Sequence, residues 1–179
     1  MTTRTHGESR AIDLIVQAAT VELFGLYDVA VAPVSDPPVR PRGSKVSGLV
    51  VGAVAFTGDG FNGQLFLAVT PDVSQATSRT QGKLFQAEGD WVKELTSQLM
   101  GRIKSRLARF GIVLRVGLPA IAQAGPASVR PASQGERIDY AFRTLRGDVL
   151  VTLAGEFAHE RLSYARAARQ SEAPDVIIF

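Results

Sequence analysis

Hydrophobic side chains recur at helical spacing in two long segments of the chain. In residues 10–26 the shared face carries Ile12, Val16, Ala19 and Leu23. In residues 90–110 it carries Val92, Leu95, Leu99, Ile103, the long stem of Arg106 and Phe110. A shorter helix is predicted for residues 71–80, because Pro71 and Asp72 form the proline-then-acid pattern of a helix start. Gly111 is predicted to end the second long helix as a C-cap.

Segments rich in β-branched and aromatic residues predict strands around these helices. They cover residues 27–34, 45–56, 64–69, 112–122, 137–145 and 148–157. The linkers 58–63 and 146–148 contain glycine, so each predicts a β-hairpin. Pro119 lies late in its segment and lacks the backbone donor that a strand ladder needs. It therefore predicts a sheet edge, a bulge or a strand end.

The glycine-rich linker 58–63 also spells G-x-G-x-x-G, the fingerprint of dinucleotide-binding folds. In those folds the motif must open a helix, whereas here Gln64 and its successors continue as a strand. We interpret the glycines as turn residues and keep nucleotide binding as a remote alternative.

Composition narrows the class of protein. The chain has 179 residues, 45% hydrophobic and 21% charged, which is typical of one globular domain. The absence of cysteine excludes disulfides, zinc–thiolate sites and cysteine nucleophiles, and it favours a cytoplasmic location. The sequence has no apolar run of about 20 residues and no secretory signal, so no membrane association is predicted. The net charge of +3 comes without a basic run interleaved with aromatics, so no nucleic-acid partner is predicted.

Four segments are predicted to lie outside the sheet and the three helices described above. Residues 1–9 form a polar, flexible N-terminus, and residues 35–44 and 123–135 form proline-containing loops. Residues 158–179 begin as a helix and end in the apolar run Asp175–Phe179. That run could dock on the sheet, pair with another subunit or be a cloning remnant.

Conventional catalytic groups are scarce. The two histidines are His6, in the predicted flexible terminus, and His159, which follows a strand beside Glu156 and Glu160. A surface role for His159 is favoured over a metal site, and no metal is predicted. Neither a G-x-S-x-G nucleophile elbow nor a P-loop occurs. Conventional hydrolase, kinase and metalloenzyme functions therefore have little support.

The helix predicted for residues 90–110 has a second stripe, opposite its apolar one. It contains Asp90, Glu94, Ser97, Gln98, Gly101 and Ser105. The core does not need these residues, so this stripe is the best candidate for a functional face. The alternative is the ordinary solvated side of an amphipathic helix.

Around this helix the sequence resembles the CheX/CheC/FliY group of chemotaxis phosphatases, and CheX-type members most closely. The family pattern is an acid or serine, a glutamate four residues later, an asparagine after three more, and a proline some twenty-odd residues on. Here it is matched by Asp90, Glu94 and Pro119, with Ser97 at the asparagine position. Gly101 and Leu107 also fall where the family helix has glycine and leucine. The segments 52–72 and 114–122 resemble the family's hairpin and proline-bearing strand, and the resemblance spans about residues 10–157.

The resemblance implies a CheC-like, two-layer α/β domain over residues 10–157. Its sheet is mixed and largely antiparallel, and both long helices pack on one face, so the other face or an edge is left for self-association as a homodimer. The implied partner is a phosphorylated receiver of the CheY type, which supplies the magnesium ion, so no cofactor of the protein's own is expected. Glu94 would pair with the receiver's lysine. The partner-binding residues would be Asp90, Glu94, Gly101, Ser105 and Pro119, and the catalytic ones Glu94, Ser97 and Gln98.

Three functions remain open at this point. Serine lacks the amide with which the family asparagine positions the attacking water, but Gln98 carries one about 40° to the other side of Glu94. If Gln98 takes that role, the protein accelerates hydrolysis of an aspartyl phosphate. If not, it is a non-catalytic adaptor in a two-component or chemotaxis pathway. A structural role like that of the middle domains of flagellar switch proteins is the third possibility.

Overall fold

The computed structural model describes residues 11–34, 48–79, 88–122 and 135–162. The helices are α1 (Ala11–Gly25), α2 (Pro71–Arg79) and α3 (Glu88–Ala108). The strands are β1 (Ala32–Pro33), β2 (Val50–Gly58), β3 (Phe61–Val69), β4 (Arg115–Val116), β5 (Ala120–Ile121), β6 (Glu136–Thr144) and β7 (Gly147–Phe157).

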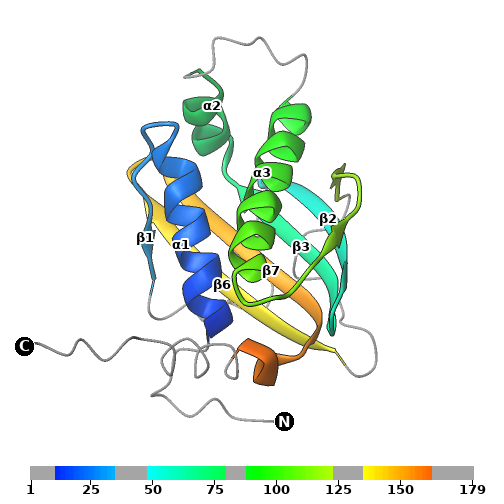
Figure 1. Ribbon diagram of the computed structural model, residues 1–179. Helices are drawn as coiled ribbons and strands as arrows, with labels where there is room; N and C mark the ends of the chain where they lie inside the picture. The colour runs from blue at the N-terminus through cyan, green and yellow to red at the C-terminus, as the bar shows by residue number, and fades with distance from the viewer. Residues whose placement is uncertain (1–10, 35–47, 80–87, 123–134, 163–179) are drawn as a thin grey trace, which may run out of the picture.

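The strands form one sheet in the order β1-β6-β7-β3-β2-β4, with β5 also paired to β2. Every pairing among these strands is antiparallel. Helices α1 and α3 lie side by side across one face of the sheet (Figure 1). The predicted α/β class, the largely antiparallel sheet and the packing of both long helices on one face are confirmed. A parallel pair, which a mixed sheet would contain, does not occur among the described strands.

The main core fills the space between these helices and the sheet. From α3 it includes Val92, Leu95, Leu99 and Ile103, as predicted, together with Trp91, Met100 and Leu107. The prediction that the stem of Arg106 joins this stripe was wrong. At helical spacing Leu107 takes the core position, while the Arg106 guanidinium reaches sideways to Glu22 on α1.

A second, smaller cluster lies on the opposite face of the sheet. It comprises the buried residues Val51, Phe66, Ala68 and Ala154, with Leu150 and others packed beside them. The four buried side chains are at most 6% exposed. The opposite face is therefore not open at this cluster, which leaves the edge of the sheet as the other place expected for self-association.

The first hairpin is tighter than predicted. Gly58 pairs with Phe61, and the two residues between them, Asp59 and Gly60, have φ of 49° and 78°. Two successive positive φ angles are typical of the type I′ turn, whose twist matches that of the flanking strands. The glycines are therefore turn residues, as predicted, but the strand after them begins at Phe61 rather than at Gln64.

Two predicted strands are largely replaced by turns. Of residues 27–34 only Ala32–Pro33 is strand, because the end of α1 folds into a turn in which the Phe24 carbonyl accepts from the N–H groups of Tyr27 and Val29. Residues 112–122 contain only the short β4 and β5, both on the outer side of β2. Pro119 stands between them at the sheet edge, where its missing N–H disrupts no ladder, as predicted.

The helix ends agree closely with prediction. Asp90 lies in the first turn of α3, two residues after its start, and Gly111 follows its end with φ of 75°, the conformation of a glycine C-cap. A helical turn follows β7 over residues 159–162, and Leu162 is buried in the main core. The predictions for residues 1–9, the loop 35–44, all but the last residue of the loop 123–135, and the run Asp175–Phe179 lie outside the described residues. Within the described ranges, no helix is long and apolar enough to cross a membrane.

Candidate functional site on helix α3

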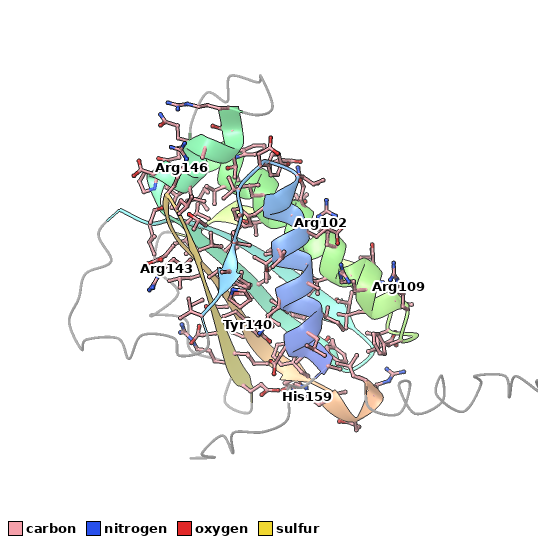
Figure 2. All side chains as sticks on the ribbon, turned by 90° about the vertical axis from the view of Figure 1, so that its left-hand side faces the viewer. Arg102, Arg109, Tyr140, Arg143, Arg146 and His159 are labelled. Carbon is pink, nitrogen blue, oxygen red and sulfur yellow. The ribbon has the colours of Figure 1, made fainter. Side chains whose placement is uncertain are left out.

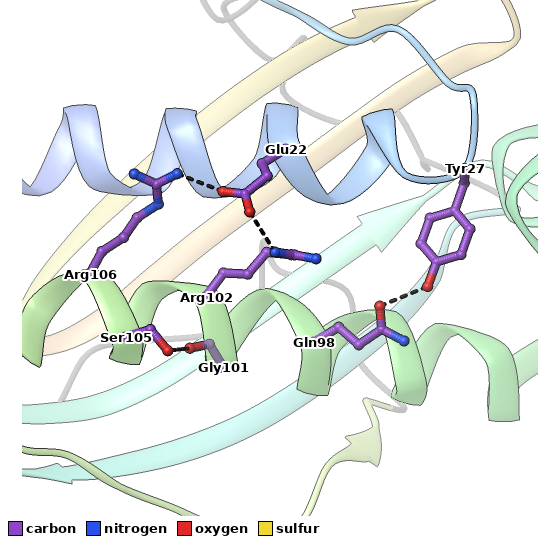
Figure 3. Close-up of polar contacts among 7 residues, drawn as sticks. All are labelled: Glu22, Tyr27, Gln98, Gly101, Arg102, Ser105 and Arg106. Atoms are coloured by element: carbon purple, nitrogen blue, oxygen red, sulfur yellow. Dashed lines mark hydrogen bonds and ion pairs between the residues drawn. The ribbon is translucent and has the colours of Figure 1, made fainter.

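The predicted polar stripe lies along one side of α3, away from the core. Asp90, Glu94, Gly101 and Ser105 are exposed, and Ser97 is half-buried among them. We call these five residues the α3 face. Gln98 is also half-buried and lies on the side of α3 nearer to α1, where Tyr27 approaches it (Figure 3).

Gln98 connects Glu94 to a buried tyrosine. The Tyr27 hydroxyl donates to Gln98 Oε1 at 2.7 Å, and Gln98 Nε2 donates to Glu94 Oε1 at 2.8 Å. The amide orientation follows from chemistry: an ionised carboxylate only accepts, so the NH₂ group must face Glu94. Glu94 is thus held by a neutral donor one helical turn away.

Tyr27 is itself firmly placed. It is 4% exposed, and its ring meets Trp91 edge-on, with centroids 5.2 Å apart and planes at 87°. Trp91 Nε1 donates to Thr77 Oγ1 on α2 at 2.7 Å. The sequence predicts a strand at Tyr27 and does not indicate this role. No local signal could reveal it, because Tyr27 and Gln98 are 71 positions apart.

Gly101 lies in the middle of α3 with nothing within 4 Å of the place where a Cβ would stand. Glycine in a helix interior costs about 1 kcal/mol relative to alanine. Since packing within the chain does not demand a glycine here, the open space suits the close approach of another molecule. Ser105 Oγ donates back to the Gly101 carbonyl at 2.9 Å.

The charged residues beside the α3 face are mostly paired with one another. Asp90 accepts from Lys93 at 2.6 Å. Glu22 of α1 accepts from Arg102 at 2.7 Å and from Arg106 at 2.6 Å, which ties the two helices together (Figure 3). The hydrogen bond from Arg106, aided by the nearby positive charges, holds the pKa of Glu22 below its usual value, although desolvation opposes this.

Glu94 differs from these acids. Among the described residues, no lysine, arginine or histidine lies within ion-pair distance of its carboxylate. Arg102 lies in the second half of α3, and Arg109 directly follows the end of the helix (Figure 2), so both come after the turn that carries Glu94. The α3 face therefore presents one positioned but electrically unpaired carboxylate.

Two other residues singled out from the sequence, Pro119 and His159, lie outside α3. Pro119 is half-buried at the sheet edge, and Ile121, two residues later, lies beside Gly89 in the first turn of α3. Strand β5 thus flanks the start of the α3 face. His159 pairs with Glu136 on β6. No group of three or more histidine or acidic side chains in the described part of the chain is placed to hold a metal ion.

Known proteins were compared with this chain by sequence and by structure. No protein-family model matches the sequence, and the search of curated proteins gives no match. Solved structures do match. CheX from Vibrio vulnificus superposes with a TM-score of 0.66 and 18% identity, over 83% of this chain and 99% of that one. CheX from Desulfovibrio desulfuricans gives a TM-score of 0.64 and 19% identity, over 80% and 97%.

The chain has the CheX/CheC-like fold. A third match is the Borrelia burgdorferi CheX–CheY–BeF₃–Mg²⁺ complex, with a TM-score of 0.55 and 12% identity, over 80% of this chain and 94% of that one. In that crystal structure the CheX-like fold is bound to CheY. At these identities the likeness establishes the fold of this chain.

Proposed function

We propose that this CheX-like protein docks on a phosphorylated receiver of the CheY type through its α3 face. The observation that carries the proposal is Glu94: an exposed carboxylate, oriented by Gln98 and unpaired with any cation of the described chain. A CheX-like neighbour that binds CheY supports the class of partner. The protein needs no cofactor of its own in this function, since the magnesium ion belongs to the receiver.

Docking would rest on complementary charge and complementary shape between the α3 face and the receiver. Glu94 would meet a cationic group of the receiver, for which the family resemblance suggests a lysine. Gly101, with no side chain and open space above it, would let the receiver backbone approach α3 closely. The small side chains of Ser97 and Ser105 leave the same path open.

A binding experiment tests this. The receiver is charged with beryllofluoride and Mg²⁺, and its affinity is measured for the wild type, Glu94→Lys and the matched control Glu156→Lys. Glu156 is an exposed acid near the end of β7, and so belongs to the sheet rather than to α3. We expect Glu94→Lys to weaken binding at least about tenfold, because it replaces attraction by repulsion, and Glu156→Lys to change it less than about twofold. Equal affinities of the two variants, or no binding by the wild type, would refute the proposal.

On catalysis we favour the adaptor function, with phosphatase activity as the second candidate. Ser97 offers no amide to the attacking water, and the Gln98 amide is already bonded to Tyr27 and Glu94. The phosphatase candidate rests on the one N–H and one lone pair that those two bonds leave on Gln98. Misplacing the group that positions the attacking water lowers the rate of aspartyl-phosphate hydrolysis on the order of 100-fold.

Loss of the phosphoryl group from an acetyl-phosphate-charged receiver separates the two candidates. Under the adaptor function, decay with the protein equals decay of the receiver alone, and Ser97→Asn accelerates it by restoring the family residue. Under the phosphatase function, the wild type already accelerates decay, and Glu94→Ala and Gln98→Ala each abolish the effect.

A further inference from the structure

The unusual feature of the α3 face is how the carboxylate of Glu94 is held. Asp90 pairs with Lys93, and Glu22 of α1 pairs with both Arg102 and Arg106, at 2.6–2.7 Å, so basic side chains both fix and neutralise these acids. Glu94 is fixed by an amide, which restrains the side chain but leaves its full charge available. A carboxylate restrained in this way is prepared for an external cation.

The amide is in turn fixed by Tyr27. Glutamine and glutamate each have three rotatable side-chain bonds, so a pair of them on a helix surface would sample many arrangements without an anchor. The Tyr27 hydroxyl provides that anchor at 2.7 Å, from a ring that is 4% exposed and lies edge-on against Trp91. The anchor comes from the turn after α1, and Trp91 is tied to α2 through Thr77, so three separate parts of the chain determine where Glu94 points.

We propose that Tyr27 and Gln98 are positioning residues for Glu94: through the hydrogen-bonded series Tyr27–Gln98–Glu94 they orient the carboxylate before the receiver arrives. Tyr27 then raises the affinity of docking although it lies beneath the α3 face. The inference rests on the proposed function. Its physical basis is that a group ordered in advance loses less conformational entropy on binding than one ordered by the partner.

The first test is Tyr27→Phe, which removes the hydroxyl and keeps the ring against Trp91. The matched control is Tyr140→Phe, because Tyr140 is also buried and its hydroxyl also donates to a side chain, Asp13, at 2.9 Å. Tyr140 lies on β6 (Figure 2), and its partner Asp13 is in the first turn of α1, whereas Tyr27 follows the end of that helix. We expect Tyr27→Phe to weaken binding of the beryllofluoride-charged receiver on the order of three- to tenfold, which corresponds to one hydrogen bond, and Tyr140→Phe to leave it unchanged.

The second test asks whether Tyr27 acts through Glu94. In a double-mutant cycle, Tyr27→Phe is compared in the wild-type and Glu94→Ala backgrounds. If the hydroxyl serves only to orient Glu94, its removal has no further effect on affinity once the carboxylate is gone. A general structural role of Tyr27 would instead lower the affinity by the same factor in both backgrounds, and that result would overturn the inference. Gln98→Met, which keeps the length of the side chain and removes both hydrogen bonds, is expected to behave like Tyr27→Phe.

The two proposals fail in different ways. If Glu94→Ala binds the charged receiver as tightly as the wild type, docking through Glu94 is wrong and the positioning role falls with it. If Glu94→Ala binds weakly while Tyr27→Phe binds normally, docking stands and the positioning role is wrong. The fluorescence of Trp91, the single tryptophan of the chain, reports whether each variant remains folded under the assay conditions.

Discussion

Gly101 and Gly111 both have open space around the position of a Cβ, but their backbones differ. Gly101 is helical, whereas Gly111 has φ of 75°, which disfavours residues with a side chain. The same substitution should therefore have opposite effects on stability at the two positions. The backbone conformation at residue 111 requires glycine, whereas the fold does not require it at residue 101. A glycine at 101 would then serve the proposed docking of a partner.

We predict that Gly101→Ala raises the free energy of unfolding by about 0.5–1 kcal/mol, since alanine loses less backbone entropy in a helix. The same variant should weaken receiver binding, because the added methyl group stands on the α3 face. Urea unfolding and a binding titration measure the two effects. Gly111→Ala is the control and should lower the free energy of unfolding by about 1 kcal/mol. A stabilised Gly101→Ala that binds normally would remove Gly101 from the docking surface.

Glu22 provides a pH-dependent prediction. Its pKa in the folded protein is lowered from 4.5, chiefly by the hydrogen bond from Arg106, so the ionised form is favoured by folding. The stability it contributes is therefore present above the unfolded pKa and is lost as the pH falls through the folded pKa. Because the side chain is 48% exposed, solvent screening keeps the contribution below about 1 kcal/mol.

The measurement is the difference in unfolding free energy between wild type and Glu22→Gln. We expect the wild type to be slightly more stable at pH 7 and the difference to vanish as the pH is lowered below 4.5. Repeating the series in 1 M salt, where the screening length is about 3 Å, should shrink the difference at pH 7. A difference that grows on acidification would contradict the assigned direction.

At the scale of elements, α3 is placed by a close contact with β2. A Cβ on Gly52 would stand 2.0 Å from Thr96 Oγ1 and 3.0 Å from the Val92 carbonyl. The helix can approach the sheet so closely only because residue 52 has no side chain. The distance between α3 and the sheet also determines how far the α3 face stands above the sheet.

Gly52→Ala should therefore lower the free energy of unfolding by about 1–3 kcal/mol, the usual penalty of overpacking. Adding Thr96→Ala removes the nearest clashing atom and should recover part of the loss. Thermal or urea unfolding of the single and double variants gives the comparison. If the loss of unfolding free energy in the double variant equals the sum of the losses in the two single variants, the side chains at positions 52 and 96 do not clash.

At the scale of the molecule, the outer edge of the sheet bears on self-association. β4 and β5 are short and each is paired to β2. The exposed Leu118 lies between them, and the exposed Ile121 is part of β5. Among the described strands, no other strand covers this edge. Unpaired backbone groups and apolar side chains at an edge favour pairing with another chain.

We therefore retain the homodimer as a prediction. Sedimentation equilibrium should give a mass twice the 19.1 kDa of the chain. Leu118→Lys, which places a charge at this edge, should shift the equilibrium towards monomer, whereas Leu145→Lys, at the exposed tip of the β6–β7 hairpin, should not. A wild-type monomer at high concentration would rule the dimer out.

The sequence by itself determined the elements with strong periodicity. The spacing of Val92, Leu95, Leu99 and Ile103 specified both the core side of α3 and, by exclusion, the face with Glu94 and Gly101. Gly58 and Gly60 indicated the hairpin turn, and Gly111 the end of the helix, because each needs a backbone conformation that other residues resist.

Only the tertiary structure decided which distant residues meet at that face. The bond from Tyr27 to Gln98 and the ion pairs of Glu22 with Arg102 and Arg106 join residues more than 70 positions apart. Residues 112–122 were divided into β4 and β5 by pairing with β2, which local preference does not encode. The spacing of apolar residues predicts which side of a helix or strand faces the core. It does not predict which side chains from neighbouring elements contact the other side. The sequence therefore singled out Glu94 as a candidate, and the fold placed the Tyr27–Gln98 hydrogen bond beside it.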